Sequence, residues 1–222
     1  MLPVRLASER ALRAIDVGSI VVVLLLLFGI AAVRGRLAHA ITAVGVVVAS
    51  VGSAELIKHG LPHIPHALHA DRPPTWPSGH TSIAVSLGLA LVLATPPVLR
   101  PVLALLGAAY AAGIGLSVVV LGWHYPSDVV GSFFICGFWA FVAAALVPTG
   151  APGRRLELQG LVLVAFAVAI GLFIAAAIAE AHPYAVAATR SSRSVVAVAT
   201  VLGVLSVALF GAFTAVLAER RS

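Results

Sequence analysis

The sequence predicts an all-α, polytopic membrane protein with about six to seven transmembrane helices. Of its 222 residues, 61% are hydrophobic and only 10% are charged, whereas charged residues make up about 25% of soluble domains. The mean hydropathy is +1.10, and the apolar runs reach the roughly 20 residues that a helix needs to cross a bilayer. A soluble core would not absorb so many of these runs, so the soluble classes are excluded.

Seven apolar spans follow one another along the chain, each bounded by charged residues, glycine or proline. They cover about residues 15–33, 37–57, 81–95, 101–121, 128–148, 159–181 and 195–217. The third span is short. No internal repeat is visible, so we expect a single domain over residues 1–222.

The first span is preceded by Arg5, Arg10 and Arg13. Such a start also marks secretory signals, but this apolar run exceeds the roughly 7–15 residues of a signal core, and no convincing cleavage site follows it. We therefore expect a first transmembrane helix. Residues 1–14 are expected to lie at the membrane interface, because apolar residues alternate with arginines there.

Charged residues and helix breakers separate the later spans. The turn at 34–36, Arg-Gly-Arg, separates the first two spans. Prolines at 96, 97 and 101 separate the third from the fourth, and a proline suits a helix start because its missing N–H is not needed there. The segments 149–159 and 182–194 are expected to be loops.

The basic residues and the cysteine fit a membrane protein. The net charge is +6, and Lys58 is the one lysine among 14 basic residues. Basic residues at helix ends are typical of membrane surfaces, so we expect no nucleic-acid partner. Cys136 is alone in an apolar run, which excludes an intrachain disulfide and predicts a buried, small hydrophobic side chain.

Connectivity predicts which polar segments share a membrane face. Spans three and four lie between residues 58–80 and residues 122–127, so both segments are expected on one face. Seven Lys and Arg residues fall on this face and seven on the other, or five against seven if Lys58 and Arg72 serve chemistry. That bias weakly favours an extracytoplasmic site, since basic residues accumulate on the cytoplasmic side.

Two short polar clusters stand out, Asp-Arg-Pro-Pro-Thr-Trp-Pro-Ser-Gly-His at 71–80 and His-Tyr-Pro-Ser-Asp at 124–128. Polar groups at the ends of membrane helices are costly, so such clusters indicate a functional site. Ser78 is a suitable N-cap for the third span, and Gly79 permits close approach of the backbone. A helix N-terminus of this kind predicts an anion cradle with His80 in its first turn.

The second cluster predicts an oriented histidine. His124 and Asp128 are four residues apart, so both lie on one helix face if the fifth span starts near Tyr125. The carboxylate would then fix the tautomer of the imidazole and raise its basicity. A nucleophile, a base and an orienting group are what covalent catalysis needs. The two clusters together predict a site that handles phosphate.

These motifs resemble the type-2 phosphatidic-acid phosphatase family, integral-membrane lipid phosphatases related to vanadium haloperoxidases. The resemblance covers about residues 50–140, the expected catalytic core. It implies that His124 is a nucleophile that forms a phosphohistidine, that Asp128 orients it, and that His80 protonates the leaving group. The family uses no metal, so no cofactor is expected. The implied substrate-binding residues are Lys58, Ser78, Gly79 and Ser117.

The chain departs from the family pattern at two points. The third motif of the family begins Ser-Arg, but this chain has Ser117-Val118. The first motif places Arg-Pro soon after the lysine, whereas here the first Arg-Pro pair after Lys58 is Arg72-Pro73. Either Arg72 binds the phosphate from a longer loop, which we favour, or the first motif is degenerate. Arg190 and Arg193, on the same face, are an alternative source of charge.

Simpler explanations exist for several of these residues. Lys58 would also fit a lysine that extends from the helix end to the interface, and Glu55, one turn earlier, predicts a local ion pair with it. The histidines at 59, 63, 66 and 69 fit a solvated loop better than a metal site. Aromatic residues at 76, 123 and 125 are typical of an interfacial belt.

The expected function is hydrolysis of a phosphomonoester or diphosphate of a lipid. Polyprenyl phosphates, phosphatidic acid and phosphatidylglycerol phosphate all fit. The Ala-, Val- and Arg-rich composition suggests a GC-rich bacterial genome, which favours polyprenyl carriers, the cell envelope and the inner membrane. The alternative is a non-catalytic lipid-phosphate binder or transporter. The expected partners are the lipid phosphate and the bilayer, and the sequence does not set the oligomeric state.

Overall fold

The computed structural model describes residues 37–60, 76–146 and 192–219, together with a few single positions before residue 30. This part of the chain is helical and contains no strand. Its helices are α3 (Leu37–Gly60), α4 (Gly79–Ala94), α5 (Arg100–Val120), α6 (Pro126–Leu146) and α9 (Ser192–Glu219), with a short 3₁₀ turn, η1 (Pro97–Leu99), before α5.

Four of these helical stretches are long and apolar enough to cross a membrane: residues 37–60, 97–120, 126–146 and 196–218. The chain is therefore an integral membrane protein, and the all-α class is confirmed. The expected first and sixth spans, about 15–33 and 159–181, lie outside the described residues or are described only at single positions. The total of six to seven spans stays a prediction. So does the interfacial segment 1–14, of which only Leu12 is described, and it is buried.

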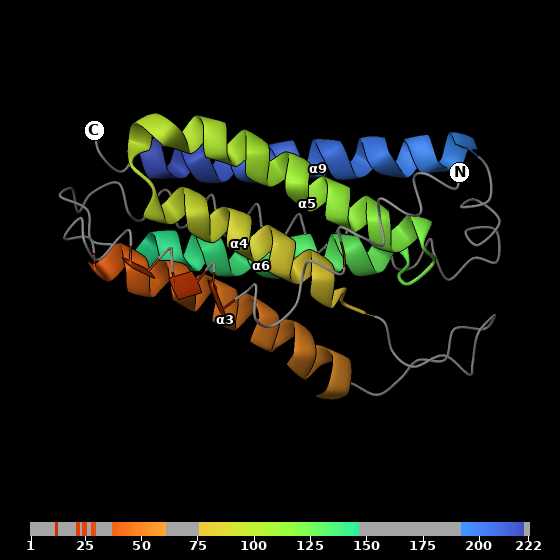
Figure 1. Ribbon diagram of the computed structural model, residues 1–222, viewed down its shortest axis with the longest axis horizontal. Coiled ribbons are helices and arrows are strands. Elements are labelled where there is room, and N and C mark those ends of the chain that lie inside the picture. The colour runs from red at the N-terminus through yellow and green to blue at the C-terminus, as the bar shows by residue number, and fades with distance from the viewer. Residues whose placement is uncertain are drawn as a thin grey trace.

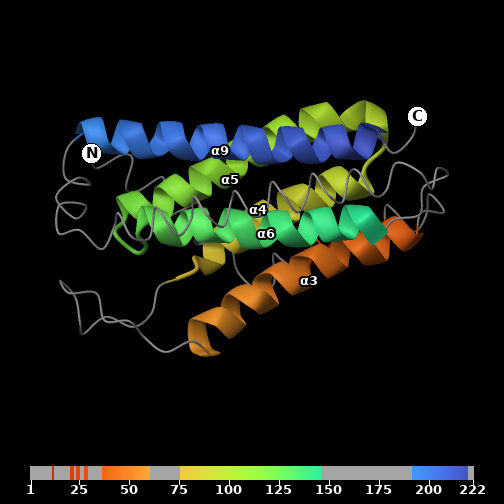
Figure 2. The same ribbon diagram turned by 180° about the vertical axis from the view of Figure 1, so that it is seen from behind.

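The helices form an elongated bundle in which α4 and α6 lie between α3 on one side and α5 and α9 on the other (Figure 1). Seen from behind, α4 crosses α6 at an angle and α5 crosses α9 at an angle (Figure 2), and the helices of each pair pack against each other. Helices α4 and α6 also pack against α3. The chain direction brings the end of α3, the start of α4, the end of α5 and the start of α6 to one end of the bundle.

Two glycines and one phenylalanine make the central contact of α4, α5 and α9. The ring of Phe210 from α9 is 1% exposed. A methyl group built on Gly88 of α4 would lie 2.7 Å from Phe210 Cζ, and one built on Gly107 of α5 would lie 2.6 Å from Phe210 Cε1. The two glycines therefore provide the space for the ring, as small residues do where membrane helices pack closely.

A buried arginine ties the helices together at the end remote from the polar clusters. Arg100, at the start of α5, is 3% exposed. Its Nε donates to the carbonyl of Thr95 at 3.2 Å, and its Nη1 donates to the carbonyl of Leu217 at 3.2 Å. The carbonyls at a helix C-terminus lack intrahelical donors and attract cations. Arg100 therefore caps α9 and fixes it to the α4–α5 connection.

Candidate active site

The site lies where α3 ends and where α4 and α6 begin. Each of these three helices contributes a residue that the sequence singled out: Lys58 from the last turn of α3, His80 from the first turn of α4 and Asp128 from the first turn of α6. The turn between α5 and α6 adds His124. The expectation that residues 58–80 and 122–127 share one end of the bundle is confirmed for the described positions.

Ser78 starts α4 as the sequence predicted. Its backbone is extended, and its hydroxyl accepts a hydrogen bond from the amide of Thr81 at 3.4 Å and one from the Thr81 hydroxyl at 3.0 Å. The Ser78 amide donates to the carbonyl of Asp128 at 3.1 Å. Since these two amides have protein acceptors, the amides of Gly79 and His80 are the first-turn donors best placed for a bound anion.

The α5–α6 turn that carries His124 is set by a glycine. Gly122 has a φ of +72°, and its amide donates to the Val119 carbonyl, while the Trp123 amide donates to the Val118 carbonyl at 2.9 Å. This pair of bonds is a Schellman motif, in which a left-handed glycine ends the helix. The amide of His124 donates to the same Val118 carbonyl at 3.2 Å. The end of α5 therefore fixes the backbone at His124.

His124 and Asp128 form the pair that their spacing predicted. His124 Nδ1 lies 3.2 Å from Asp128 Oδ2, and the carboxyl side chain is 2% exposed. The same oxygen accepts the amide of Tyr125 at 3.0 Å, which is how an acidic residue at the third helical position caps a helix N-terminus. With Nδ1 facing the carboxylate, Nε2 is the nitrogen that can attack a substrate.

Hydrogen bonds to backbone carbonyls join the start of α4 to the start of α6. Besides the bond from the Ser78 amide to the Asp128 carbonyl, the Ser132 hydroxyl lies 2.8 Å from the Ser78 carbonyl and 3.0 Å from the Asp128 carbonyl. Gly131 allows the indole of Trp76 to lie against α6, since a methyl group there would be 2.8 Å from Trp76 Cε2. The anion cradle and the histidine pair are therefore held in one rigid unit.

His80 lies at the polar end of α4, before the apolar run at 81–95, and is half-buried. Its ring centroid is 5.8 Å from that of Trp123, with the planes tilted by 55°. Burial lowers the pKa of His80 below its usual 6.5, and the positive charges of His124 and Lys58 lower it further. His80 is thus close enough to both residues for their charges to act on it.

Lys58 and Glu55 lie beside the start of α4. Their side chains form the expected ion pair, with Lys58 Nζ 3.0 Å from Glu55 Oε1. A methyl group built on Gly79 would lie 3.4 Å from that carboxylate oxygen and 3.5 Å from Lys58 Nζ. The other oxygen, Oε2, lies 3.3 Å from His59 Nε2. The ion pair therefore faces the anion cradle, which was not expected of Glu55.

Other expected phosphate-binding residues are placed differently or lie outside the described residues. The Ser117 hydroxyl donates to the Gly113 carbonyl of its own helix at 2.8 Å. Val118, in the position of the family's arginine, is fully buried in the apolar core. Arg72 and the histidines at 63, 66 and 69 lie outside the described residues, and the side chains of Arg190 and Arg193 are not described.

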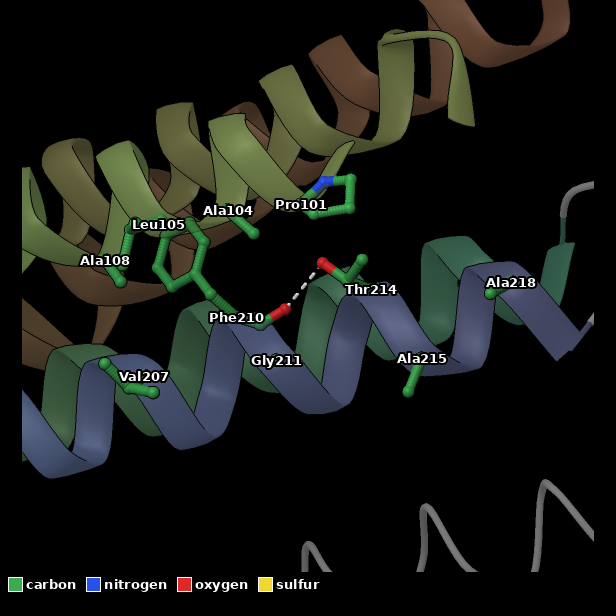
Figure 3. Close-up of a pocket in the computed structure, with 10 residues that line it drawn as sticks. All are labelled: Pro101, Ala104, Leu105, Ala108, Val207, Phe210, Gly211, Thr214, Ala215 and Ala218. Carbon is green, nitrogen blue, oxygen red and sulfur yellow. Dashed lines mark hydrogen bonds between the residues drawn. The ribbon is translucent and has the colours of Figure 1, made fainter. Parts of the chain in front are cut away.

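The described residues contain no cluster of three or more His, Cys, Asp or Glu side chains that could hold a metal ion. A cavity of about 440 Å³ lies between α5 and α9, toward the end of the bundle remote from His124. Figure 3 shows its lining of Pro101, Ala104, Leu105, Ala108, Val207, Phe210, Gly211, Thr214, Ala215 and Ala218. No ionisable side chain is among these residues, so the cavity has no part in acid–base chemistry.

The model of the PAP2 superfamily matches residues 40–151, which is half of the chain, and the chain belongs to that superfamily. Its members are phosphatases that act on phosphate esters. The matched region contains α4, α5, α6 and nearly all of α3, and therefore every described residue of the site. No curated protein and no solved structure matches the chain.

Two features of the site lay beyond sequence reasoning. The position of the Glu55 carboxylate against Gly79 depends on how α3 and α4 pack, and the spacing to Lys58 revealed only the ion pair. Ser132, which bridges the two helix starts, carried one weak signal, because it lies one helical turn after Asp128 and on the same face. A serine at such a position is also common in helix packing.

Proposed function

We propose that the chain is a membrane lipid phosphatase that hydrolyses a phosphomonoester or diphosphate of a lipid through a phosphohistidine on His124. The observation that carries this proposal is that His124 pairs with the buried Asp128 carboxylate beside the N-terminal turn of α4. An oriented imidazole next to an anion cradle is what nucleophilic phosphoryl transfer requires. Binding alone would not need Nδ1 to be fixed by a buried carboxylate, so the pair favours catalysis over a binder or transporter.

In the first step, His124 Nε2 attacks phosphorus and the bond from phosphorus to the lipid oxygen breaks. His80, protonated while the anionic phosphate is bound, gives its proton to the leaving oxygen. Asp128 stabilises the positive charge that develops on the His124 ring. The amides of Gly79 and His80, with the ammonium of Lys58, hold the phosphoryl oxygens, whose negative charge is the main target of catalysis.

In the second step, a water molecule attacks the phosphohistidine. His80, now neutral, takes a proton from this water, the bond from phosphorus to Nε2 breaks, and inorganic phosphate leaves. Each residue is thereby returned to its starting protonation state. The proposal gives Ser78 a structural role in capping the cradle, and Ser117 a role as phosphate ligand only if its hydroxyl leaves the Gly113 carbonyl.

The missing third-motif arginine leaves room for another cation, and we propose Arg72. It lies five residues before Pro77, so the extended chain between them spans at most about 17 Å. A guanidinium donates two parallel hydrogen bonds to phosphate, which an ammonium does not. Arg72→Lys should therefore lower kcat/KM nearly as much as Arg72→Ala. Wild-type rates in both variants would show that the arginine is not a ligand.

For the biological setting we propose a polyprenyl phosphate or diphosphate as substrate, in the inner membrane of a bacterium and in envelope synthesis. The composition supports the bacterial origin, and the charge count of Lys and Arg residues weakly favours an extracytoplasmic site. A site at the end of a bundle of apolar helices suits a substrate whose phosphate lies at the membrane surface while its chain stays in the bilayer.

The experiment is a phosphate-release assay with the purified protein and a panel of lipid phosphates in mixed micelles. The wild type should release phosphate, a metal chelator should leave the rate unchanged, and vanadate should inhibit by mimicking pentacoordinate phosphorus. His124→Ala should abolish turnover while the circular dichroism spectrum and the melting temperature stay near those of the wild type.

The matched control is His59→Ala, which removes an exposed histidine from α3 and should keep the rate of the wild type. Trapping of ³²P on the wild type and not on His124→Ala would support the phosphohistidine. If His124→Ala kept near-full activity, the mechanism would be wrong. If the wild type bound lipid phosphate but released none, the binder or transporter would be the better description.

A further inference from the structure

A carboxylate lies in the wall of the proposed anion cradle. Glu55 Oε1 is 3.4 Å from the position of a methyl group on Gly79, whose amide is one of the two donors of the cradle. A negative charge at this place opposes the binding of any anion. No step of the proposed reaction uses Glu55, so its presence there requires another explanation.

The two oxygens of Glu55 face different surroundings. The inner oxygen, Oε1, pairs with Lys58 Nζ at 3.0 Å, while the outer oxygen, Oε2, lies 3.3 Å from His59 Nε2. The Lys58 side chain is 18% exposed and that of His59 is 73% exposed. The inner contact is therefore on the side of the cradle, and the outer contact is on the solvent side. One carboxylate thus offsets the charge of the lysine that is proposed to hold the phosphate.

Few described cations stand at this end of the bundle. Of the Lys and Arg side chains that the structure describes, Lys58 lies at the site and Arg100 lies at the opposite end, capping α9. The position of the family's arginine holds Val118, which is buried in the apolar core. Among the described residues at this end of the bundle, no Lys or Arg side chain other than Lys58, which Glu55 offsets, is left to balance the charge of a second phosphoryl group.

We propose that Glu55 is a specificity-determining residue that favours lipid monophosphates over lipid diphosphates, an inference that rests on the proposed phosphatase function. The transferred phosphoryl group lies at His124 and the leaving oxygen lies at His80. In a diphosphate, that leaving oxygen carries the second phosphoryl group. The charge of Lys58 acts on His80, so we place this group on the side of the cradle that Lys58 and Glu55 line, where the Glu55 carboxylate repels its additional charge.

The test compares one prenyl chain carrying a monophosphate with the same chain carrying a diphosphate. Glu55→Gln removes the charge and keeps the shape, so the ratio of kcat/KM for monophosphate to that for diphosphate should fall by at least roughly tenfold, because one charge that repels the second phosphoryl group is lost. Glu55→Asp keeps the charge and should give a ratio nearer to that of the wild type.

His59→Gln is the matched control, because it removes the outer partner of Glu55 and leaves the inner ion pair. Its ratio should equal that of the wild type. The proposal is overturned if Glu55→Gln leaves the ratio unchanged. If Glu55→Gln lowered kcat/KM equally for both substrates, Glu55 would only hold Lys58 in place. If Glu55→Gln kept the wild-type rates on both substrates, Glu55 would have no influence on the site.

A binding measurement separates this inference from the proposed function. Calorimetry with inorganic phosphate and with pyrophosphate, on His124→Ala with and without Glu55→Gln, needs no turnover. Removal of the carboxylate should tighten pyrophosphate binding roughly tenfold more than phosphate binding. If the wild type hydrolyses neither lipid, the phosphatase proposal fails, and this difference still decides the role of Glu55. Equal changes for the two anions would overturn it.

Discussion

One carboxylate oxygen of Asp128, Oδ2, accepts a hydrogen bond from the backbone amide of Tyr125 and also pairs with Nδ1 of the His124 ring. Asp128→Asn keeps an oxygen for the amide but removes the charge that selects the His124 tautomer. We expect kcat to fall on the order of 10³–10⁴-fold, as in the corresponding change in a serine protease. The melting temperature should change little, which thermal unfolding in detergent would measure.

Asp128→Ala removes the helix cap as well, at a cost of about 1 kcal/mol. It should therefore be as inactive as Asp128→Asn and also less stable. If Asp128→Asn kept more than a tenth of the activity, the carboxylate would not control the tautomer, and the nucleophile would need another assignment.

The lowered pKa of His80 predicts the pH dependence of the reaction. The first step needs His80 with its proton, and kcat/KM reports the free enzyme. Burial and the charges of His124 and Lys58 lower the pKa of His80, so His80 loses its proton at a lower pH than an ordinary histidine. As the pH rises, kcat/KM should therefore fall, with a midpoint below pH 6.5. Lys58→Gln removes one of these charges and should move the midpoint upward.

The substrate phosphate also titrates near pH 6, but it does so equally in both proteins. The difference between the pH profiles of the wild type and Lys58→Gln therefore belongs to the protein. Identical profiles would contradict the assignment of His80 as the acid.

At the scale of single residues, the sequence predicted contacts that lie within one helical turn and missed those that join distant segments. The His124–Asp128 and Glu55–Lys58 pairs follow from their spacing along one helix face. The amide of Ser78 was expected to bind phosphate, yet it donates to the Asp128 carbonyl. That partner lies 50 residues away, and its arrival depends on the packing of α4 against α6.

Among the elements, the Schellman turn at the end of α5 decides where His124 stands. Gly122 has φ +72°, and a methyl group there would meet nothing within 4 Å, so Gly122→Ala would act through backbone strain alone. We expect a loss of about 1–2 kcal/mol in stability and a larger loss in kcat than in substrate affinity, because the nucleophile shifts. Steady-state kinetics and thermal unfolding would measure both.

Gly113 in the middle of α5 is the matched control. A methyl group there also meets nothing within 4 Å, but the residue has helical backbone. Gly113→Ala should stabilise the helix by about 0.5–1 kcal/mol and keep the activity. If both alanine variants behaved alike, the left-handed conformation of Gly122 would not matter for the site.

The elements themselves were largely predictable, because their ends coincide with charge, glycine and proline. The third span was expected to be short and to begin at the Ser-Gly-His turn, and α4 covers Gly79–Ala94. The second span was expected at 37–57, while α3 continues to Gly60. Lys58 therefore lies within the last turn of the helix. The expected span ended before Lys58, where the apolar run gives way to polar residues, but a helix continues as long as its backbone bonds are satisfied.

Over the whole molecule, the packing of α9 on the catalytic helices depends on Gly88, Gly107 and Phe210. A methyl group on either glycine would lie under 3 Å from the Phe210 ring, so Gly107→Ala should cost about 1–3 kcal/mol through overpacking. Phe210→Leu in the same protein should restore part of this loss, giving a non-additive pair. Thermal unfolding in detergent would measure the three variants.

Gly52→Ala on α3 is the control, because a methyl group there meets nothing within 4 Å. It should not lower the melting temperature. Additive effects of Gly107→Ala and Phe210→Leu on the melting temperature would contradict direct contact between a methyl group at position 107 and the ring of Phe210.

The place of Phe210 also determines what the smallest working unit of this protein is. The family match ends at residue 151, and a fragment cut there would keep every described residue of the site. It would lack the Phe210 ring, which fills the space at Gly88 and Gly107. It would also lack the Leu217 carbonyl, which accepts a hydrogen bond from Arg100 Nη1. We therefore expect such a fragment to be inactive alone and to regain activity when residues 152–222 are co-expressed as a separate chain. The protein would then work as a split enzyme, in which binding of the separate α9 chain to the catalytic helices restores activity.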